Sequence, residues 1–295
     1  MRPANLKTKI FLDSGDPQET KQALDLLGFL DGQTTNPSLV ANKLKKNNEG
    51  IKLSAQNLLS EYKKIVQEVS VLIPKGSVSI EVYADKNSTA QQLFVQGQEM
   101  FSWIPNAHIK FPTTTAGLEA AQKAIQNKMR VNMTLVFTQQ QAAAVFAATR
   151  GAKFGEVFVS PFIGRLDDTN VNGMSLVDNI SKMYKTQSEN HVQVLAASIR
   201  TLPHFLYNIY AKTDIVTVPY ELLKKWSDLG KPLPGENINI AAFEDEKVYL
   251  KAEKLENIPF EDLNLENTWQ EYSINHPLTD TGLEKFAADW NSLIL

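Results

Sequence analysis

The sequence contains no cysteine among its 295 residues, and this absence excludes several kinds of site. Without cysteine there is no disulfide framework, no thiolate nucleophile and no cysteine-based zinc site. The four histidines, His108, His191, His204 and His276, lack the spacing of paired metal ligands. A transition-metal site would have to be built from carboxylates alone, so we expect the protein to use no metal.

An excess of charge of one sign is absent as well. Lysine and arginine number 30 and aspartate and glutamate 33, so the formal net charge is −3. This balance gives no electrostatic attraction to nucleic acid or anionic membranes as the main partner. Residues 1–9 lack the apolar core of a signal peptide, and no stretch approaches the ~18 apolar residues of a membrane span. We therefore expect a cytoplasmic protein that binds neither nucleic acid nor membranes.

Motifs for nucleotide cofactors are also missing. No G-x-G-x-x-G or G-x-x-x-x-G-K-S/T sequence follows the first apolar run. The G-x-S-x-G motif that carries a serine nucleophile is absent too. We accordingly expect no cofactor. What the chain does have is a globular composition, with 43% hydrophobic and 21% charged residues.

Short apolar runs alternate with helical patterns along most of the chain. We predict strands at residues 9–13, 32–36, 78–83, 108–111, 131–137, 157–160, 192–197 and 215–218. Helix-start signals follow several of these runs, such as Asp16 before Pro17 and the S/T-x-x-Q sequences at Ser88 and Thr138. Eight strands that alternate with helices predict a (β/α)8 TIM barrel over residues 1–229, with a doubly wound open sheet as the alternative.

The composition changes after Trp226. Residues 230–235 are rich in glycine and proline, and an acidic stretch begins at Glu244 and includes Asp245 and Glu246. Residues 283–293 carry apolar side chains at helical spacing, including Phe286. We predict that residues 230–295 form a mainly helical C-terminal extension, which packs on the barrel or on a neighbouring subunit of a homo-oligomer.

Polar side chains follow the predicted strands in succession, at the ends where barrel enzymes place their chemistry. These residues are Asp13, Asn36, Glu81, Lys110, Thr134, Ser160 and Ser198. Each alone has an ordinary structural explanation, such as an ion-pair partner for Glu81 or a turn former for Asn36. Burying so many polar groups together costs free energy unless they pair or bind a ligand, so we interpret the set as an active site.

Lysine is the strongest nucleophile that these absences leave. Burial disfavours the ammonium form of Lys110 and leaves an amine that can attack a carbonyl, and the resulting iminium lets an adjacent carbon–carbon bond break. Asp13 and Glu81 supply carboxylates for proton transfer. Arg165 and Arg200, in predicted loops after the sixth and seventh strands, suit a phosphate. The residues therefore predict a metal-free Schiff-base aldol enzyme that acts on phosphosugars.

The same residues lie in an ordered set of motifs by which the sequence resembles the transaldolases. The motifs are FLDSGD at 11–16, TTNPSL at 34–39, VSIEV at 78–82, IKFP at 109–112, VNMTL at 131–135, SPFIGR at 160–165 and ASIR at 197–200. The sequence departs from the family pattern at Thr115 and Thr201, where an aromatic residue and an asparagine are common. The resemblance implies a class I aldolase on a barrel fold.

The resemblance also implies a role for each site residue. Lys110 would form the Schiff base with the keto carbon of a ketose phosphate, Asp13 would be the general acid and base, and Glu81 with Thr134 would position the proton-shuttling water. The implied substrate-binding residues are Asn36, Asn132 and Ser160 at the dihydroxyacetone fragment, Arg165, Ser198 and Arg200 at the phosphate, and Phe162.

The implied reaction moves a dihydroxyacetone unit from sedoheptulose 7-phosphate to glyceraldehyde 3-phosphate, which gives erythrose 4-phosphate and fructose 6-phosphate in the non-oxidative pentose phosphate pathway. Two other functions stay open. Fructose-6-phosphate aldolases share the lysine but typically carry glutamine in place of Glu81 and tyrosine in place of Phe162, so both residues favour transaldolase. A non-catalytic sugar-phosphate binder would need the arginines but not Lys110 or Asp13.

Overall fold

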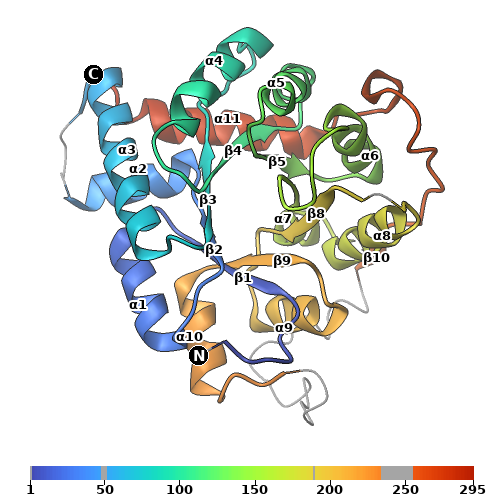
Figure 1. Cartoon of the computed structure of the whole chain (residues 1–295), viewed down its shortest axis with the longest axis horizontal. Coiled ribbons are helices and arrows are strands. Elements are labelled where there is room, and N and C mark those ends of the chain that lie inside the picture. The colour runs from blue at the N-terminus through green and yellow to red at the C-terminus, as the bar shows by residue number, and fades with distance from the viewer. Residues whose placement is uncertain (1, 48–51, 189, 234–254) are drawn as a thin grey trace.

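A closed barrel of eight parallel strands forms the centre of the molecule (Figure 1). The computed structural model describes residues 2–47, 52–188, 190–233 and 255–295. The barrel strands, in spatial order, are β1 (Lys9–Asp13), β2 (Gly32–Thr34), β3 (Ser77–Glu81), β4 (Ala107–Pro112), β5 (Val131–Val136), β6 (Val157–Pro161), β8 (Val192–Ala196) and β9 (Ile215–Val218). The barrel closes where Lys9 pairs with Ile215. The prediction of a (β/α)8 barrel is confirmed, and the open sheet is excluded.

Helices follow each barrel strand and cover the outside of the barrel (Figure 1). They are α1 (Pro17–Leu27), α2 (Pro37–Asn47), α3 (Ala55–Leu72), α4 (Ala90–Phe101), α5 (Thr115–Gln126), α6 (Gln139–Ala148), α7 (Ile163–Asp167), α8 (Gly173–Lys185), α9 (Leu202–Ala211) and α10 (Tyr220–Asp228). Asp16 and Thr138 cap α1 and α6 as predicted. The cap of α4 is Thr89 rather than Ser88, because the Ser88 hydroxyl donates to Asp85.

The alanine-rich helix α6 is buried on nearly all sides, whereas a barrel helix usually leaves one face in water. Residues 255–276 cover its outer face. Gln139 Nε2 donates to Pro259 O at 2.8 Å, and Gln141 Nε2 donates to Ile274 O at 2.9 Å. The small side chains of α6 thus let the C-terminal part of the chain pack closely against the barrel wall.

A second, two-stranded parallel sheet pairs β7 (Val171–Asn172) with β10 (Glu256–Asn257). The sequence did not predict it, because strands of two residues are too short to show alternation. The short 3₁₀ helix η4 (Trp269–Glu271) follows further along the chain. Of the predicted linker and acidic stretch, Pro234, Gly235 and the residues Glu244, Asp245 and Glu246 lie outside the described residues.

The helix α11 (Pro277–Asn291) crosses the carboxyl ends of the barrel strands and reaches α2 (Figure 1). It docks on an irregularity in β5, where the register shifts and Leu135 adopts a φ of 60°. Thr279 Oγ1 donates to Leu135 O at 2.9 Å. The opposite end of α11 is held where Ser38 donates to Asp289. This helix therefore packs on the barrel of its own chain.

None of the helices in the described part of the chain combines the length and apolar character that crossing a bilayer requires.

Candidate functional site

A cleft opens at the carboxyl ends of the barrel strands, with about 660 Å³ of empty space including its open mouth. This is the end of a TIM barrel at which enzymes place their active sites. Seven residues predicted from the sequence line it, namely Asp13, Asn36, Lys110, Ser160, Phe162, Arg165 and Ser198. Four others, Glu81, Asn132, Thr134 and Arg200, do not form its wall.

Lys110 lies at the bottom of the cleft beside Glu81. The strand register places the two residues directly opposite each other on β4 and β3. Lys110 Nζ is 2.9 Å from Glu81 Oε2 and donates to Thr35 O at 3.3 Å. Both side chains are about 95% buried, which makes the pair an internal one rather than a surface contact. Such a pair is a place where a proton can pass between nitrogen and oxygen.

Burial raises the pKa of the Glu81 carboxyl, and the Lys110 ammonium partly opposes that rise. Two buried oxygens here are short of partners. Among the described residues, no group makes an aligned hydrogen bond to Glu81 Oε2, and none bonds to Thr134 Oγ1. Buried polar atoms without partners are places where water or a ligand is expected. The arrangement can therefore bind a water molecule and exchange protons with it.

Asp13 ends β1, which is separated from β3 by one strand, and it also lines the cleft. Thr34 Oγ1 donates to Asp13 Oδ1 at 2.7 Å and also contacts Thr217 Oγ1 at 2.6 Å. Burial raises the pKa of Asp13, with Lys110 again acting in the opposite direction. A carboxyl whose pKa is raised toward neutrality is suited to take and return a proton. Thr34 and Thr217 were not predicted, although Thr34 is the direct cross-strand neighbour of Asp13.

Asn132 and Ser160 form a chain of hydrogen bonds inside the barrel. Ser160 Oγ donates to Asn132 Oδ1 at 2.7 Å, and Asn132 Nδ2 donates to Ser79 Oγ at 3.1 Å. Both ends of the Asn132 amide are thus occupied, and Asn132 orients Ser160 from below. Asn36 Oδ1 accepts from Leu39 N at 2.9 Å and so caps α2, while Asn36 Nδ2 makes no hydrogen bond to the residues that the structure describes. Its amide nitrogen is the atom left for a ligand.

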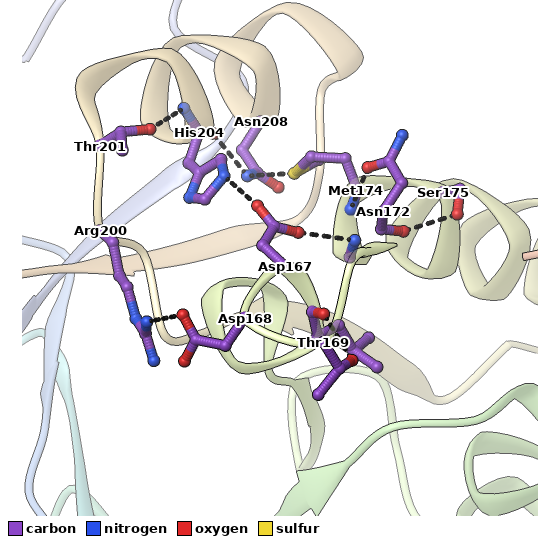
Figure 2. A network of polar contacts seen from close by, with 12 residues as sticks. Asp167, Asp168, Thr169, Asn172, Met174, Ser175, Arg200, Thr201, His204 and Asn208 are labelled. Atoms are coloured by element: carbon purple, nitrogen blue, oxygen red, sulfur yellow. Dashed lines mark hydrogen bonds and ion pairs between the residues drawn. The ribbon is translucent and has the colours of Figure 1, made fainter. Parts of the chain in front are cut away.

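The two predicted arginines differ in position. Arg165, on α7, is half-buried, and its guanidinium lies over two aromatic rings, at 5.2 Å from the centre of Phe162 and 5.3 Å from that of Phe286. Arg200 is exposed and forms an ion pair with Asp168 (Figure 2), and it is not among the residues that line the cleft. Arg165 is the cation that lines the cleft from this side.

Arg165 lies on α7 and not in a loop as predicted, and α7 closely approaches the loop that carries Arg200. Gly164 N donates to Ser198 O at 3.0 Å, and Ser198 has a φ of 58°. A Cβ atom at Gly164 would lie 2.6 Å from Ser198 O and 2.7 Å from the Arg200 side chain. Glycine is therefore required at residue 164, between Ser198 and Arg200.

Asp167, the last residue of α7, connects this helix to α8 and α9, as Figure 2 shows. Its Oδ1 accepts from Gly173 N at 2.9 Å, and its Oδ2 lies 2.8 Å from His204 Nε2. One carboxylate thus joins α7 to the first turns of α8 and α9. Sequence reasoning missed this pair, since Asp167 and His204 are 37 residues apart and belong to no common motif.

The helix α11 contributes Lys285 and Phe286 to the cleft. The sequence indicated a helix here but not its location, because nothing in a single sequence specifies which end of the barrel it covers. Gly282 allows the approach, since a Cβ atom there would lie 2.5 Å from Arg165 Nη1 and 2.6 Å from Leu135 Cδ2. Within the described ranges, no group of three or more histidine, aspartate or glutamate side chains is arranged to hold a metal ion.

Comparisons with known proteins agree with this geometry. A family model described as transaldolase/fructose-6-phosphate aldolase matches residues 10–295. A probable transaldolase from Dehalococcoides mccartyi is 34% identical over 285 residues, which cover 97% of this chain and 99% of that protein. Probable transaldolases from Syntrophomonas wolfei and Geobacillus kaustophilus are each 32% identical, over 96% of this chain and 98% of their own length.

Proposed function

Because the chain belongs to the transaldolase/fructose-6-phosphate aldolase family, we propose that it moves a dihydroxyacetone unit from sedoheptulose 7-phosphate to glyceraldehyde 3-phosphate through a Schiff base on Lys110. The observation that carries this proposal is the buried Lys110–Glu81 pair at the bottom of the cleft, with Asp13 also on the cleft wall. The products would be erythrose 4-phosphate and fructose 6-phosphate, formed in a cytoplasmic step of the non-oxidative pentose phosphate pathway.

Imine formation uses the Lys110–Glu81 pair. The Lys110 ammonium passes a proton to the Glu81 carboxylate, 2.9 Å away, and becomes an amine. The amine nitrogen bonds to the keto carbon of the donor sugar, and one proton passes from that nitrogen to the carbonyl oxygen, which becomes a hydroxyl. Glu81 then protonates this hydroxyl, which leaves as water as the carbon–nitrogen double bond forms. Thr134 Oγ1, which is buried and without a partner among the described residues, would hold the water that relays these protons.

Cleavage and transfer use Asp13. Its carboxylate takes the proton of the hydroxyl next to the scissile bond, that bond breaks, and its electron pair passes to the iminium to give an enamine on Lys110. The shortened aldose phosphate leaves. The enamine carbon then attacks the acceptor aldehyde, Asp13 returns the proton to the new hydroxyl, and a water molecule hydrolyses the iminium. The water lost at imine formation is regained, and Lys110 is restored.

Substrate binding would place the phosphate at Arg165, which the rings of Phe162 and Phe286 hold in place. A guanidinium binds phosphate oxygens in a bidentate manner. Ser198 lies on the same side of the cleft, and Arg200 would join the phosphate by leaving Asp168. Asn36 and Ser160 would bond the hydroxyl groups of the dihydroxyacetone unit. Glu81 and Phe162, rather than glutamine and tyrosine, support transfer to an acceptor over release of free dihydroxyacetone.

The proposal is tested by borohydride reduction in the presence of fructose 6-phosphate, followed by mass analysis of the peptides. We expect a reduced dihydroxyacetone adduct on Lys110 and none in Lys110→Ala. An adduct on another lysine, or none on the folded protein, would overturn the Schiff base and favour a sugar-phosphate binder. A second assay compares fructose 6-phosphate formed from the two substrates with dihydroxyacetone released without an acceptor. Release as fast as transfer would favour a fructose-6-phosphate aldolase.

A further inference from the structure

The hydrogen-bond ladder between β2 and β3 is interrupted next to Lys110. Ser77 N donates to Asp31 O at 3.1 Å, and bonds of this kind recur every two residues along both strands of a parallel pair. The next members of the series join residue 79 to 33 and residue 81 to 35, so Glu81 N should donate to Thr35 O. Glu81 N instead donates to the hydroxyl of Tyr62 at 2.9 Å.

The sequence itself explains why the ladder stops at this point. The residue that would complete the next pair from the β2 side is Pro37, which has no amide hydrogen. Asn36 and Pro37 instead begin α2, so the β2 side turns away just after Thr35. This leaves a gap in the barrel wall into which Tyr62 inserts its hydroxyl from α3.

The positions of the hydrogens in this gap follow from the bonds. Thr35 Oγ1 donates its only hydrogen to Ser79 O at 2.8 Å, so Tyr62 must be the donor in its 2.5 Å contact with Thr35 Oγ1. Burial raises the pKa of Tyr62, which keeps that proton in place. The result is an unbroken series from the Glu81 amide through Tyr62 and Thr35 to the carbonyl of Ser79.

The position of Tyr62 is fixed by its packing. Its side chain is 1% exposed. Trp103 contacts the ring edge-on, with centres 6.0 Å apart, and Trp290 of α11 lies 5.8 Å away. A hydroxyl on so restricted a ring has little freedom to choose other partners.

Because Glu81 N bonds to Tyr62, the carbonyl oxygen of Thr35 is not used by the strand ladder and can accept from Lys110. Thr35 O accepts from Lys110 Nζ at 3.3 Å, and the other neighbour of Nζ is Glu81 Oε2 at 2.9 Å. We infer that Tyr62 is a positioning residue for the Lys110–Glu81 pair, because its hydroxyl holds the Glu81 backbone and leaves Thr35 O to the lysine. This inference rests on the proposed Schiff-base function.

This arrangement would affect the chemistry by fixing the orientation of the Lys110 amine. After Glu81 takes one proton, the Lys110 amine keeps two hydrogens and one lone pair. Thr35 O holds one of these hydrogens in a fixed direction, which restricts where the lone pair points. Small errors in the aim of a nucleophile cost large factors in rate. Without the Tyr62 hydroxyl, the Glu81 amide is left unpaired or turns to Thr35 O, where it competes with Lys110.

The test compares Tyr62→Phe with Tyr184→Phe. Tyr184 is equally buried and donates one hydrogen bond, to Ala142 O at 2.7 Å, but it lies on α8 away from the cleft. The rate of borohydride trapping at saturating fructose 6-phosphate, kcat and KM are measured below the melting temperature of each variant. We expect Tyr62→Phe to lower the trapping rate and kcat by about ten-fold or more, with KM within about two-fold. Tyr184→Phe should change none of the three.

The inference is overturned if the wild type traps normally and Tyr62→Phe matches Tyr184→Phe, or if only KM changes. Failure of the wild type to trap at all is a different result, which refutes the proposed function itself. Should Tyr62→Phe not fold, Thr35→Val and Thr35→Ser provide the same test. Valine removes the hydroxyl to which Tyr62 donates, and serine keeps it, so the valine variant alone should lose trapping rate. Equal rates in the two variants contradict the inference.

Discussion

Lys110 and Glu81 lie opposite each other on neighbouring barrel strands, with Nζ and Oε2 2.9 Å apart and both side chains buried. Each residue alone would be costly to bury in charged form, because neither water nor another opposite charge at this distance would compensate it. The pair lowers that cost and keeps a proton within reach of both atoms. Removing one partner should therefore affect the other as well as the chemistry.

We predict that Lys110→Met abolishes imine trapping and makes stability depend on pH through Glu81. Burial raises the pKa of Glu81, and Lys110 opposes the rise, so the variant raises that pKa further. A folded-state pKa above the unfolded value stabilises the protein at low pH, and this contribution is lost as pH rises through the folded pKa. The melting temperature of Lys110→Met, measured against the wild type, should thus fall from pH 5 to pH 8. Adding Glu81→Gln should remove this dependence; its persistence would contradict the assignment.

Asp13→Asn should abolish transfer and stabilise the fold at neutral pH. Burial raises the pKa of Asp13, so the ionised form, which is the proposed base, is disfavoured in the folded protein, and its cost in stability is present above the raised pKa. Asparagine removes this cost and can still accept from Thr34. We expect a melting temperature at pH 7 higher by roughly 2–4 °C, which corresponds to about 1 kcal/mol in a chain of this size. The exposed Asp25→Asn is the control, and an unchanged kcat in Asp13→Asn would exclude Asp13 as the base.

The pKa of Asp13 also predicts the acid side of the pH–rate profile. In the proposed mechanism ionised Asp13 takes the proton during cleavage, so kcat should fall as pH drops through a pKa raised above the ordinary 3.8. The measurement is kcat against pH at saturating substrate. A profile that stays flat down to pH 3.8 would be inconsistent with this role.

Asp168→Ala should tighten sugar-phosphate binding slightly. Asp168 pairs with Arg200, which does not line the cleft, and both side chains are about half exposed. Exposed ion pairs contribute about 0–1 kcal/mol, so freeing Arg200 should lower KM for fructose 6-phosphate by at most about five-fold, with kcat unchanged. Asp228→Ala breaks a comparable exposed pair with Lys224 on α10 and should leave KM as it is. A rise in KM would show that Asp168 helps Arg200 bind phosphate instead of competing for it.

Phe286→Leu should weaken phosphate binding through Arg165. Leucine keeps an apolar side chain but removes one of the two rings that hold the guanidinium, a contact worth about 0.5–1 kcal/mol. We expect KM for fructose 6-phosphate to rise by about two- to five-fold at constant kcat. The matched control is Phe260→Leu, which removes the ring under Lys182, outside the cleft. Equal KM values for the two variants would mean that α11 does not position Arg165.

The strands and their inward side chains were predictable because alternation and turn residues are local signals. Strand ends were less certain. The strand β2 ends at Thr34, two residues before the predicted end, because Asn36 and Pro37 start the next helix. In β5, alternation fails at Leu135, where a positive φ shifts the register. A sequence pattern does not reveal this bulge, at which Leu135 O accepts a hydrogen bond from Thr279 of α11, 144 residues away.

The direction of Arg200 and the location of α11 could not be predicted, because both depend on partners distant in the sequence. Arg200 pairs with an aspartate 32 residues earlier, and Phe286 contacts Arg165 from a helix that lies far along the chain. The residue types at the site, by contrast, were apparent from the strand ends. The sequence thus revealed the polar groups at the strand ends, but not the residues distant in the sequence that contact them.

The cleft draws its wall from residues as far apart as Asp13 and Phe286. No short fragment of the chain contains it, so affinity for substrate is a property of nearly the whole fold. Ligand binding and global unfolding are then thermodynamically linked, and substrate at about a hundred times its Kd would add about 2.7 kcal/mol to the free energy of unfolding. Cellular substrate concentration would in this way regulate how long the protein survives proteolysis, as well as how fast it works.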